Sequence, residues 1–427
     1  MMVFFLKQIF PHALIEKGVR FWQFIKAQRE ANKTTIFAKH LHSRNSTISV
    51  VFIISFTEAF SSFKPLYELL KKDRRFSVFL ICCPNIREPG WTAYNASYEF
   101  LSKVYPEAIH AYKDSRWFDI KTLSPDYVFY CRPYNPDYYE NYRASIVRTY
   151  AKVCYIPYSF CLEHKSNHNF NFVNNYDFLQ NCSYVFASND YESNVLTKRF
   201  FSSKIKNGYP RILSVGFTRF DLAYNENPIM KSKPFTILYT PRWTSHLKKK
   251  NEEGTFLKFI EHIIDYASHN ADVQIIIRPH PLMFSHYIQN NIVPPNYFEK
   301  LEDTCSKSGN IYFDKGKDYF ESLNKADIFL SDYTSLLVEY FVSGKPVIYL
   351  GSLRLYNKKA KKMCKSFYIL NDWKQIEERI QKLKNKEDPL LDTRKKLFSE
   401  IIKNYKEASK NILETLVKDF KTKGEFL

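Results

Sequence analysis

Three polar motifs in the second half of the chain each follow a short apolar run of the kind that forms a strand. The first motif is Thr240-Pro241-Arg242, at the end of the run Phe235 to Thr240. An arginine at a strand end suits a phosphate group, because its guanidinium fork presents paired N–H donors to two oxygens. Taken alone, Arg242 would be interpreted as a solvated loop charge, so the assignment of Thr240 and Arg242 to phosphate binding depends on the other motifs.

The second motif places an arginine and a histidine among two prolines. It reads Arg278-Pro279-His280-Pro281 and closes the apolar run that starts at Val273. Proline fixes φ and biases the preceding residue toward extended backbone, so His280 is held in a restrained conformation beyond the strand. A lone histidine more often satisfies a local hydrogen bond. The neighbouring Arg278 and the two prolines favour a ligand-binding role for His280.

The third motif is rich in hydroxyl groups. It reads Ser331-Asp332-Tyr333-Thr334-Ser335, follows the run Asp327 to Leu330, and precedes a helical pattern that ends at Gly344-Lys345-Pro346. Such residues can cap a helix, and Gly-Lys-Pro is a typical helix end. The start of this helix would offer unpaired N–H groups and the positive end of the helix dipole, which form a phosphate site without glycine.

The alternative for the third motif is that Asp332 and Thr334 are helix caps only, which does not explain the arginine and histidine at a neighbouring strand end. Glu339 comes four residues after Ser335 and so lies on the same helix face one turn further, where a carboxylate could accept hydrogen bonds from ribose hydroxyls. The predicted phosphate-binding and donor-binding set is Thr240, Arg242, Arg278, His280, Ser331, Asp332, Thr334, Ser335 and Glu339.

The elements that must position these motifs are short apolar runs that alternate with helical patterns. The runs cover residues 48–56, 76–83, 126–131, 152–156, 184–187, 212–215, 235–240, 273–278, 310–313, 327–331, 347–350 and 367–370. Nearly continuous apolar runs are typical of parallel strands buried on both faces. The alternation predicts two doubly wound α/β domains that face a cleft, and loops at the carboxyl ends of their strands make that cleft the default ligand site.

The domain organisation predicted from these patterns has four parts. They are a basic amphipathic extension at 1–45, a Rossmann-like domain at 46–228, a second Rossmann-like domain at 229–372 and a basic helical tail at 373–427 that packs back on the domains. The polar segment 225–234 is the expected linker, and the tail is broken near Pro389. The stretch Phe4 to Ala27 fits either an amphipathic helix on an anionic membrane or a helix docked on its own domain.

Composition excludes several classes of protein. The 427 residues carry 63 Lys+Arg and 44 Asp+Glu, a formal net charge of +19, and 45% are hydrophobic, which is enough for a sizeable core. The ten glycines have no spacing that could form the dinucleotide fingerprint or the Walker loop. The eight cysteines form no C-x-x-C pair, which predicts reduced, buried thiols of an intracellular protein. No apolar segment is long enough to span a bilayer.

Taken in order, the T-P-R-W, R-P-H-P and S-D-Y-T-S motifs, followed by a glutamate and G-K-P, resemble the nucleotide-binding half of the CDP-glycerol glycerophosphotransferase family. This is the family of teichoic acid and capsule polymer transferases with a GT-B fold, and the resemblance covers roughly residues 233–350. It implies that the pyrophosphate of a cytidine-activated donor is held by Arg278, His280, Asp332, Thr334 and Ser335. It also implies an acceptor domain at 46–228 and a nucleotide-donor domain at 229–372.

The first half departs from the family pattern. The family usually has a His-Gly pair after a strand of the first domain, with that histidine as the candidate base, but Tyr158-Ser159 stands at the matching place. The base has therefore moved to another side chain, or the acceptor chemistry differs. The candidates left open are Tyr158, Glu163, His164, His168 and, just after the first strand, Glu58, while His280 is the catalytic candidate in the second domain.

The function that this resemblance implies is transfer of a glycerol-phosphate or related alditol-phosphate group from a CDP-activated donor to a hydroxyl of a cell-surface glycan or lipid-linked acceptor. Arginine, histidine and a helix end would stabilise the developing charge. Since these groups can replace a metal ion, we expect no metal and no cofactor. The expected partners are the CDP-linked donor, a lipid-linked or polymeric glycan acceptor and an anionic membrane surface, and the expected location is the cytoplasmic face of the cell membrane.

Two alternatives remain at this stage. A glycosyltransferase that uses a CMP-sugar or UDP-sugar could employ the same phosphate-binding groups, with attack at a sugar carbon instead of phosphorus. A nucleic-acid-binding protein would account for the +19 charge and the 31 tyrosines through backbone contacts and stacking. No helix-turn-helix, RNP or zinc motif is present, and the basic residues are scattered, so we expect no nucleic-acid partner.

Overall fold

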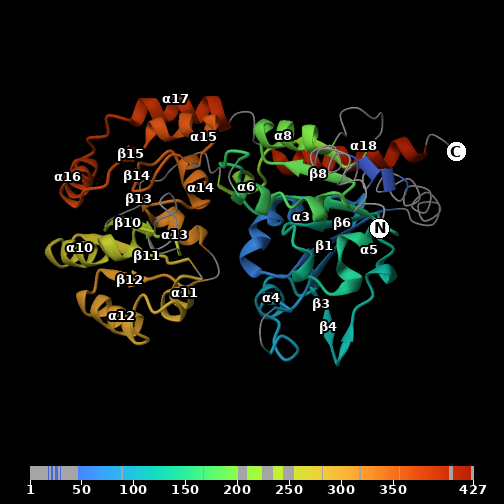
Figure 1. Cartoon of the computed structure of the whole chain (residues 1–427), viewed down its shortest axis with the longest axis horizontal. Coiled ribbons are helices and arrows are strands. Elements are labelled where there is room, and N and C mark those ends of the chain that lie inside the picture. The colour runs from blue at the N-terminus through green and yellow to red at the C-terminus, as the bar shows by residue number, and fades with distance from the viewer. Residues whose placement is uncertain are drawn as a thin grey trace, which may run out of the picture. The chain divides into compact units, whose positions relative to one another are not determined.

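The computed structural model describes residues 18, 21, 22, 25, 26, 29, 47–87, 90–166, 168–200, 209–223, 234–243, 254–280, 282–316, 319–354, 356–402 and 407–424. The chain divides into two compact units, both visible in Figure 1. Unit 1 comprises Met1–Cys161, His168–Asp221 and Glu407–Leu427. Unit 2 comprises Leu162–Asn167 and Leu222–Lys406. Neither unit is continuous in sequence. Residues 162–167 lie between two segments of unit 1 but belong to unit 2, and the C-terminal segment 407–427 follows unit 2 but belongs to unit 1.

Unit 1 contains a seven-stranded parallel sheet with the order β3-β2-β1-β6-β7-β8-β9. Its strands are β1 (Ile48–Ile54), β2 (Phe76–Cys82), β3 (Ile109–His110), β6 (Tyr127–Tyr130), β7 (Lys152–Tyr155), β8 (Tyr184–Ala187) and β9 (Arg211–Ser214). Alternate residues of β1 enter two cores: Val50 and Phe52 pack with α3 (Lys64–Lys71), whereas Val51 and Ile53 belong to the cluster that contains α8 (Asp190–Phe200). Both faces of the sheet are therefore covered, as in a doubly wound fold.

Shorter elements of unit 1 connect the strands. They are η1 (Thr57–Ser62), α4 (Ala96–Leu101), η2 (Ile120–Leu123), η3 (Asn135–Asp137), η4 (Glu140–Tyr142), α5 (Ala144–Val147), α6 (His168–Val173), α7 (Tyr176–Leu179) and α9 (Phe220–Ala223). A small antiparallel hairpin, β4 (Tyr112–Lys113) and β5 (Arg116–Trp117), lies outside the main sheet.

Unit 2 contains a six-stranded parallel sheet with the order β12-β11-β10-β13-β14-β15. The strands are β10 (Phe235–Thr240), β11 (Val273–Ile277), β12 (Ile311–Phe313), β13 (Ile328–Ser331), β14 (Val347–Tyr349) and β15 (Tyr368–Ile369). The helices are α10 (Phe256–His269), α11 (Met283–Gln289), α12 (Tyr297–Ser308), α13 (Phe320–Lys325), α14 (Leu336–Val342), α15 (Lys358–Met363), α16 (Trp373–Lys384) and α17 (Leu391–Ile402), with η6 (Cys364–Ser366) after α15.

The prediction of two doubly wound, Rossmann-like α/β sheets is confirmed, and each apolar run named from the sequence forms a strand. The strand β3 and the β4–β5 hairpin were not predicted, because each of these two-residue strands contains a polar or charged residue, His110, Lys113 or Arg116, and therefore forms no apolar run. The hairpin turn uses Asp114 and Ser115 with φ of 51° and 61°, the left-handed geometry that a two-residue hairpin loop requires. Trp117 from this hairpin stacks on Tyr139 with ring centroids 4.4 Å apart.

The tail predicted at 373–427 divides between the two units. The helices α16 and α17, separated around Pro389 as expected, belong to unit 2, whereas α18 (Ala408–Gly424) belongs to unit 1. The unit boundary follows Asp221, seven residues before the boundary expected at 228. The expected linker at 225–234, apart from Pro234, and nearly all of the extension at 1–45 lie outside the described residues.

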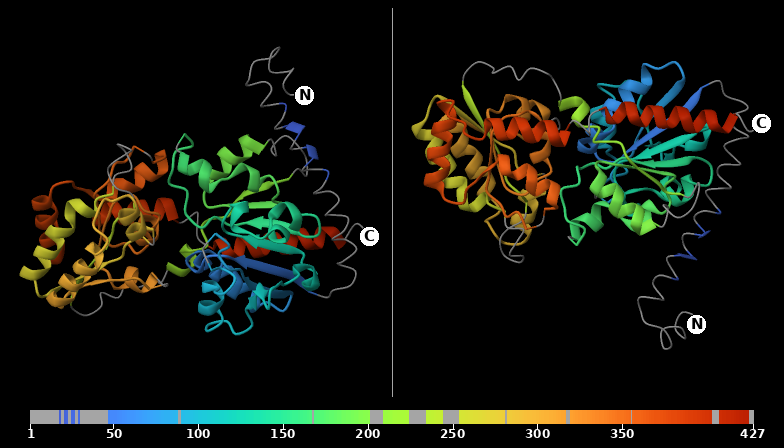
Figure 2. Two further views of the ribbon diagram at one scale, coloured as in Figure 1. Left: turned by 60° about the horizontal axis from the view of Figure 1, so that its bottom comes forward. Right: turned by 90° about the horizontal axis from the view of Figure 1, so that it is seen from above.

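The helix α18 is fixed to unit 1 by one buried carboxylate. Asp419 accepts hydrogen bonds from Tyr127 at 2.5 Å and Tyr184 at 2.7 Å, and it accepts the Lys152 ammonium at both oxygens, at 2.7 and 2.6 Å. Ile412 and Leu416 on the same helix are completely buried in the core that β1 and α3 share. The helix α18, drawn in red near the C-terminus, runs along unit 1 (Figure 2). A segment from the end of the chain thus completes the unit formed by its beginning.

All eight cysteines are buried, and none of them forms a disulfide bond. Burial raises the pKa of the Cys82 thiol to about 12 and that of Cys305 to about 11. The expectation of buried thiols is confirmed. Among the described residues, no helix is both long enough and apolar enough to cross a membrane.

Candidate active site

The strand order of unit 2 brings the three motifs together. Because β10 lies between β11 and β13, the residues that follow these three parallel strands meet at the same edge of the sheet. Thr240 is in register with Ser331, and the Arg278 N–H donates to the carbonyl of Tyr239 at 2.8 Å. The arrangement that the sequence analysis expected of the motifs, adjacent strand ends, is present in unit 2.

Two of the predicted phosphate-binding hydroxyls bond to each other. The Thr240 hydroxyl donates to the Ser331 hydroxyl at 2.7 Å, and the Ser331 hydroxyl donates to the Thr240 carbonyl, also at 2.7 Å. Thr240 is 3% exposed and Ser331 is completely buried. In this structure the two hydrogen bonds join the carboxyl ends of strands β10 and β13, where the motifs meet.

Asp332 fixes the loop that follows β10. One carboxylate oxygen accepts the Arg242 backbone N–H at 2.8 Å, and the other accepts both the backbone N–H and the hydroxyl of Thr255, at 2.8 and 2.9 Å. Asp332 is completely buried, and burial raises its pKa to about 6 even though these bonds act in the opposite direction. A single side chain therefore holds the two ends of the segment between Arg242 and Thr255.

Arg278 is held in place by the loop after β12. Its guanidinium donates to Asp314 at 2.6 Å and to the Gly316 carbonyl at 2.7 Å, and it lies 5.8 Å from the Tyr319 ring centroid. Burial acts to raise the pKa of Asp314, but the bonds from Ser322, Gly316 and Arg278 outweigh it and lower that pKa. The Arg278 side chain is 13% exposed, so its position is fixed before any ligand arrives.

His280 is exposed beyond the end of β11. Its Nδ1 accepts the Leu282 backbone N–H at 3.1 Å, which places the proton of the neutral ring on Nε2. The ring lies beside Trp243, with centroids 6.2 Å apart. The ring is therefore oriented by its own turn and by a residue of the loop after β10.

Glu163 joins the donor motifs although the sequence analysis placed it in the first domain. The segment 162–167 belongs to unit 2, and the Glu163 carboxylate accepts the Tyr333 hydroxyl at 2.9 Å and the Leu162 N–H at 3.1 Å. The Arg242 guanidinium lies 4.8 Å from the Tyr333 ring centroid. Burial raises the pKa of Glu163, and the Tyr333 hydrogen bond and the Arg242 charge only partly offset this.

Tyr333 is a site residue that the sequence analysis did not select. It lies between Asp332 and Thr334, stacks on Tyr356 with centroids 5.3 Å apart, and connects Glu163 with Arg242. Its position inside the third motif was the available signal. The contact depends on the segment 162–167, which is remote in sequence.

The remaining residues of the third motif lie at the start of α14. Ser335 is exposed and occupies the N-cap without a side-chain cap bond, and the Thr334 hydroxyl accepts the Leu336 N–H at 3.4 Å. Glu339, which was expected to contact ribose hydroxyls, is 3% exposed and accepts the Tyr319 hydroxyl at 2.6 Å. As expected, α14 ends just before Gly344, whose φ is 73°.

The other candidates for the base divide between the units. His164 is exposed in unit 2, with Nδ1 2.7 Å from the Ser166 hydroxyl. Tyr158 lies in unit 1 after β7, with its hydroxyl 3.0 Å from that of Tyr134. Glu58 is half-buried in η1 of unit 1. The side chain of His168 lies outside the described residues.

Arg132 is a second residue that the sequence analysis missed. It follows β6 in unit 1, its guanidinium lies 3.8 Å from the Phe56 ring centroid and 5.8 Å from that of Tyr158, and it donates to Asp137 at 2.9 Å. The signal was its place directly after a strand, the same signal that selected Arg242 and Arg278. It forms a cationic group at the carboxyl edge of the first sheet.

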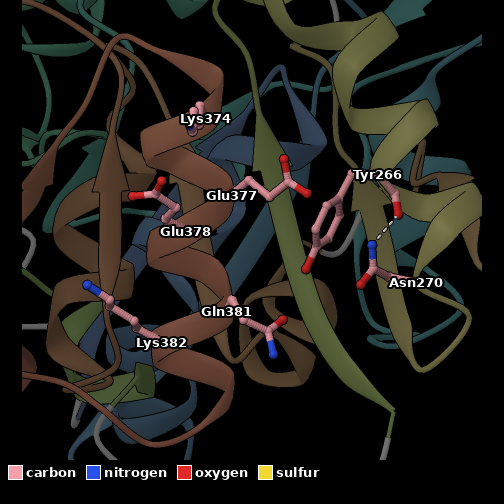
Figure 3. Close-up of a pocket in the computed structure, with 7 residues that line it drawn as sticks. All are labelled: Tyr266, Asn270, Lys374, Glu377, Glu378, Gln381 and Lys382. Atoms are coloured by element: carbon pink, nitrogen blue, oxygen red, sulfur yellow. Dashed lines mark hydrogen bonds between the residues drawn. The ribbon is translucent and has the colours of Figure 1, made fainter.

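A pocket of about 600 Å³ lies elsewhere in unit 2, between α10 and α16 (Figure 3). It is lined by Tyr266, Asn270, Lys374, Glu377, Glu378, Gln381 and Lys382. Tyr266 and Asn270 are at the end of α10, which leads into the amino end of β11. None of the predicted site residues lines this pocket. Among the described residues there is also no group of three or more side chains arranged to hold a metal ion.

The two doubly wound sheets, with polar motifs at the strand ends of the second, define a protein of the GT-B fold class. Among solved structures, UDP-GlcNAc 2-epimerase from Neisseria meningitidis bound to UDP-GlcNAc matches with a TM-score of 0.55 and 17% identity, over 87% of this chain and 100% of that chain. A histidine-to-asparagine variant of the wall teichoic acid polymerase TagF, soaked with CDPG, matches with a TM-score of 0.56 and 14% identity, over 97% and 99%. At these identities the likeness shows the fold.

The family follows from the sequence match. The CDP-Glycerol:Poly(glycerophosphate) glycerophosphotransferase family matches residues 160–418, which is more than half of the chain, and the protein belongs to this family. No curated protein matches the chain with significance. The predicted family and the prediction of a glycerophosphotransferase-class enzyme are confirmed.

Proposed function

We propose that the protein transfers a glycerol-phosphate or related alditol-phosphate group from a CDP-linked donor to a hydroxyl of a lipid-linked or polymeric cell-surface glycan, in teichoic acid, capsule or lipo-oligosaccharide biosynthesis. The observation that carries the proposal is the meeting of Arg278, His280 and the Asp332-Tyr333-Thr334 segment at adjacent strand ends of unit 2. The structure of TagF soaked with CDPG supports a CDP-linked donor for a related fold. We also propose that the reaction takes place at an anionic membrane surface on the cytoplasmic side.

In the proposed reaction, the oxygen of the acceptor hydroxyl forms a bond to the phosphorus that bears the glycerol. The bond from that phosphorus to the bridging oxygen breaks, and CMP leaves with the electron pair. Negative charge grows on the bridging and non-bridging oxygens, so fixed cations and aligned N–H donors lower the barrier. Arg278, already positioned by Asp314, and the imidazole of His280 are suited to contact these oxygens.

Glu163 is the residue that we assign as the base for the acceptor hydroxyl. Its carboxylate lies beside Tyr333 and near Arg242, among the donor motifs, and its raised pKa makes it a stronger proton acceptor than an ordinary glutamate. Tyr333 would orient the carboxylate through its hydrogen bond. The proton of the attacking hydroxyl would pass to the carboxylate oxygen as the new phosphorus–oxygen bond forms.

The donor is tested by turnover with a panel of nucleotide-linked donors, and we expect transfer from CDP-glycerol with release of CMP. Full turnover is expected in the presence of EDTA, because the proposed charge stabilisation uses protein groups. CDP-glycerol and CMP should also raise the thermal unfolding temperature, because a ligand that binds only the folded state stabilises it. Transfer of a sugar from a CMP-sugar or UDP-sugar, with no reaction of CDP-glycerol, would establish the glycosyltransferase alternative.

The base is tested with Glu163→Gln, which keeps the size of the side chain. Turnover should fall by about 100-fold, the usual scale of general base catalysis. In the wild type the rate should rise with pH through the raised pKa of Glu163, and the variant should lack this rise. Glu58→Gln, Tyr158→Phe and His164→Ala serve as comparisons and should cost much less. A larger loss in one of those three variants would transfer the role of base to that residue.

A further inference from the structure

A set of exposed lysines covers two neighbouring elements of unit 2. On α15 and η6 the described side chains of Lys358, Lys359, Lys361, Lys362 and Lys365 are exposed, whereas Ala360 and Met363 are buried. The helix α17 packs beside α15 and adds exposed Lys395 and Lys396 (Figure 1). We call these seven residues the lysine surface.

The lysine surface has little opposing charge of its own. On α15, η6 and the described part of α17, the acidic residues are Asp392 and Glu400. Glu400 forms an ion pair with Lys362 at 2.5 Å, which joins the two helices. Seven ammonium groups against two carboxylates form a concentrated positive field, and such a field attracts a polyanion.

The lysine surface begins at the candidate active site. Tyr356, two residues before α15, pairs with Glu163 through a β-bridge and stacks on Tyr333. Asn357, the N-cap of α15, donates its backbone N–H to the Leu162 carbonyl at 2.8 Å and caps the helix through the Ala360 N–H at 2.9 Å. The first lysine of the surface is therefore one residue beyond the segment that holds the proposed base.

We propose that the lysine surface binds the phosphate groups of the growing acceptor next to its reacting end, and this proposal rests on the proposed function. An acceptor that already carries glycerol-phosphate units has an anionic phosphodiester in every unit. Lysine ammonium groups on flexible stems suit such a ligand, because they follow a chain of charges without requiring one fixed geometry. With the terminal hydroxyl beside Glu163, the preceding units would lie along α15 and toward α17.

The composition of the lysine surface favours a polymeric anion over a membrane. A helix that binds a membrane surface inserts large apolar side chains beneath its basic residues. Among the described side chains of α15, η6 and α17, the one large apolar side chain that is exposed is Leu391, at 39%. The apolar side chains of α15 are turned inward instead. The described side chains of this face therefore present positive charge to a ligand but no apolar cluster that could insert into a membrane.

The test compares two triple variants. The first is Lys358→Gln, Lys361→Gln and Lys365→Gln, which leaves the Lys362–Glu400 ion pair intact. The matched control is Lys300→Gln, Lys374→Gln and Lys382→Gln, which removes three exposed lysines from α12 and α16 of the same unit. KM is measured for an acceptor with one glycerol-phosphate unit and for an acceptor with many units.

For the first variant we expect KM for the long acceptor to rise by about tenfold, and KM for the short acceptor to change by less than about twofold. Added salt should reduce the difference, because it screens exposed charges. The control variant should behave as the wild type. Equal effects on both acceptors, or no effect on either, would overturn the proposal.

A binding measurement separates this proposal from the proposed function. Titration of each protein with purified poly(glycerophosphate), without a donor, should show weaker binding for the first variant only. If the wild type transfers no glycerol-phosphate but this difference is found, the proposed function fails and the lysine surface stands. Flotation with phosphatidylglycerol vesicles tests the membrane alternative. If the first variant loses vesicle binding but binds the polymer as the wild type does, the lysine surface is a membrane contact and the proposal is wrong.

Discussion

Replacement of His280 by alanine should lower turnover by about 100-fold or more and leave the thermal unfolding temperature unchanged. The imidazole is exposed, and the contacts described for it are the local Leu282 hydrogen bond and the Trp243 ring. Its removal therefore opens no cavity in the core. The expected loss arises because the ring is held at a strand end beside Arg278, where negative charge would develop during transfer. Turnover with CDP-glycerol and thermal unfolding of the same preparation measure the two effects.

His286→Ala is the matched control for this variant. His286 also contacts the Trp243 ring, at 4.9 Å between centroids, but it belongs to α11 and not to the strand end. If the role of His280 were only to support Trp243, the two variants would lose similar activity. We expect His286→Ala to stay within about threefold of the wild type, and comparable losses would refute a direct role for His280.

Replacement of Asp332 by alanine should lower both stability and turnover. Three donors, the N–H groups of Arg242 and Thr255 and the Thr255 hydroxyl, would lose their acceptor. At about 1 kcal/mol or more for each unsatisfied buried donor, the free energy of unfolding should fall by about 3 kcal/mol. Turnover should fall because Arg242 and Trp243 are no longer held beside Tyr333 and His280. Urea unfolding and steady-state kinetics check the two parts.

Asp327→Asn is a control at the other end of the same strand. Asp327 also bridges two strands, but it accepts one backbone N–H, that of Thr236 at 2.8 Å, at the amino end of β13. Its replacement should cost less stability and leave turnover nearly unchanged. A large activity loss in Asp327→Asn would mean that any weakening of β13 inactivates the enzyme, and the special role of Asp332 would then be lost.

The pH dependence of Asp332→Asn gives an independent check. Burial raises the pKa of Asp332 to about 6, so the folded state binds this proton more tightly than the unfolded state does. The contribution of this proton to stability is complete below the unfolded pKa and is lost as the pH rises through about 6. Asparagine does not titrate, so the stability cost of Asp332→Asn should be greater at about pH 5 than at about pH 8, by about 1 kcal/mol. A cost independent of pH would contradict the raised pKa.

The sheets could be predicted from the sequence because buried parallel strands produce apolar runs that need no partner to be recognised. Val50 to Ile53 face two different cores, so every position of the run must be apolar. The strand β3 has no such signature, because its two residues are one isoleucine and one histidine. The assignment of α18 to unit 1 could not be predicted either, because Asp419 finds its partners at Lys152, Tyr127 and Tyr184, far away in sequence.

For the site, the sequence predicted which residues follow adjacent strands, but not what their side chains contact. Thr240 and Ser331 have the chemistry of a phosphate site, yet their hydroxyls bond to each other because the strand register places them side by side. Tyr333 was missed because its role depends on Glu163, which is remote in sequence and is brought to it by the fold. Residue type and spacing identify candidate site residues, whereas the tertiary contacts of each side chain determine what that side chain can bind.

The attachment of α18 has a consequence for the order of synthesis. A ribosome makes the strands of unit 1 first, then all of unit 2, and only then the helix that carries Asp419. Until that helix emerges, the Lys152 ammonium and the hydroxyls of Tyr127 and Tyr184 lack their hydrogen bonds to Asp419. The sequence of the unit that begins the chain is thus completed last, because all of unit 2 except residues 162–167 is synthesised between Asp221 and α18.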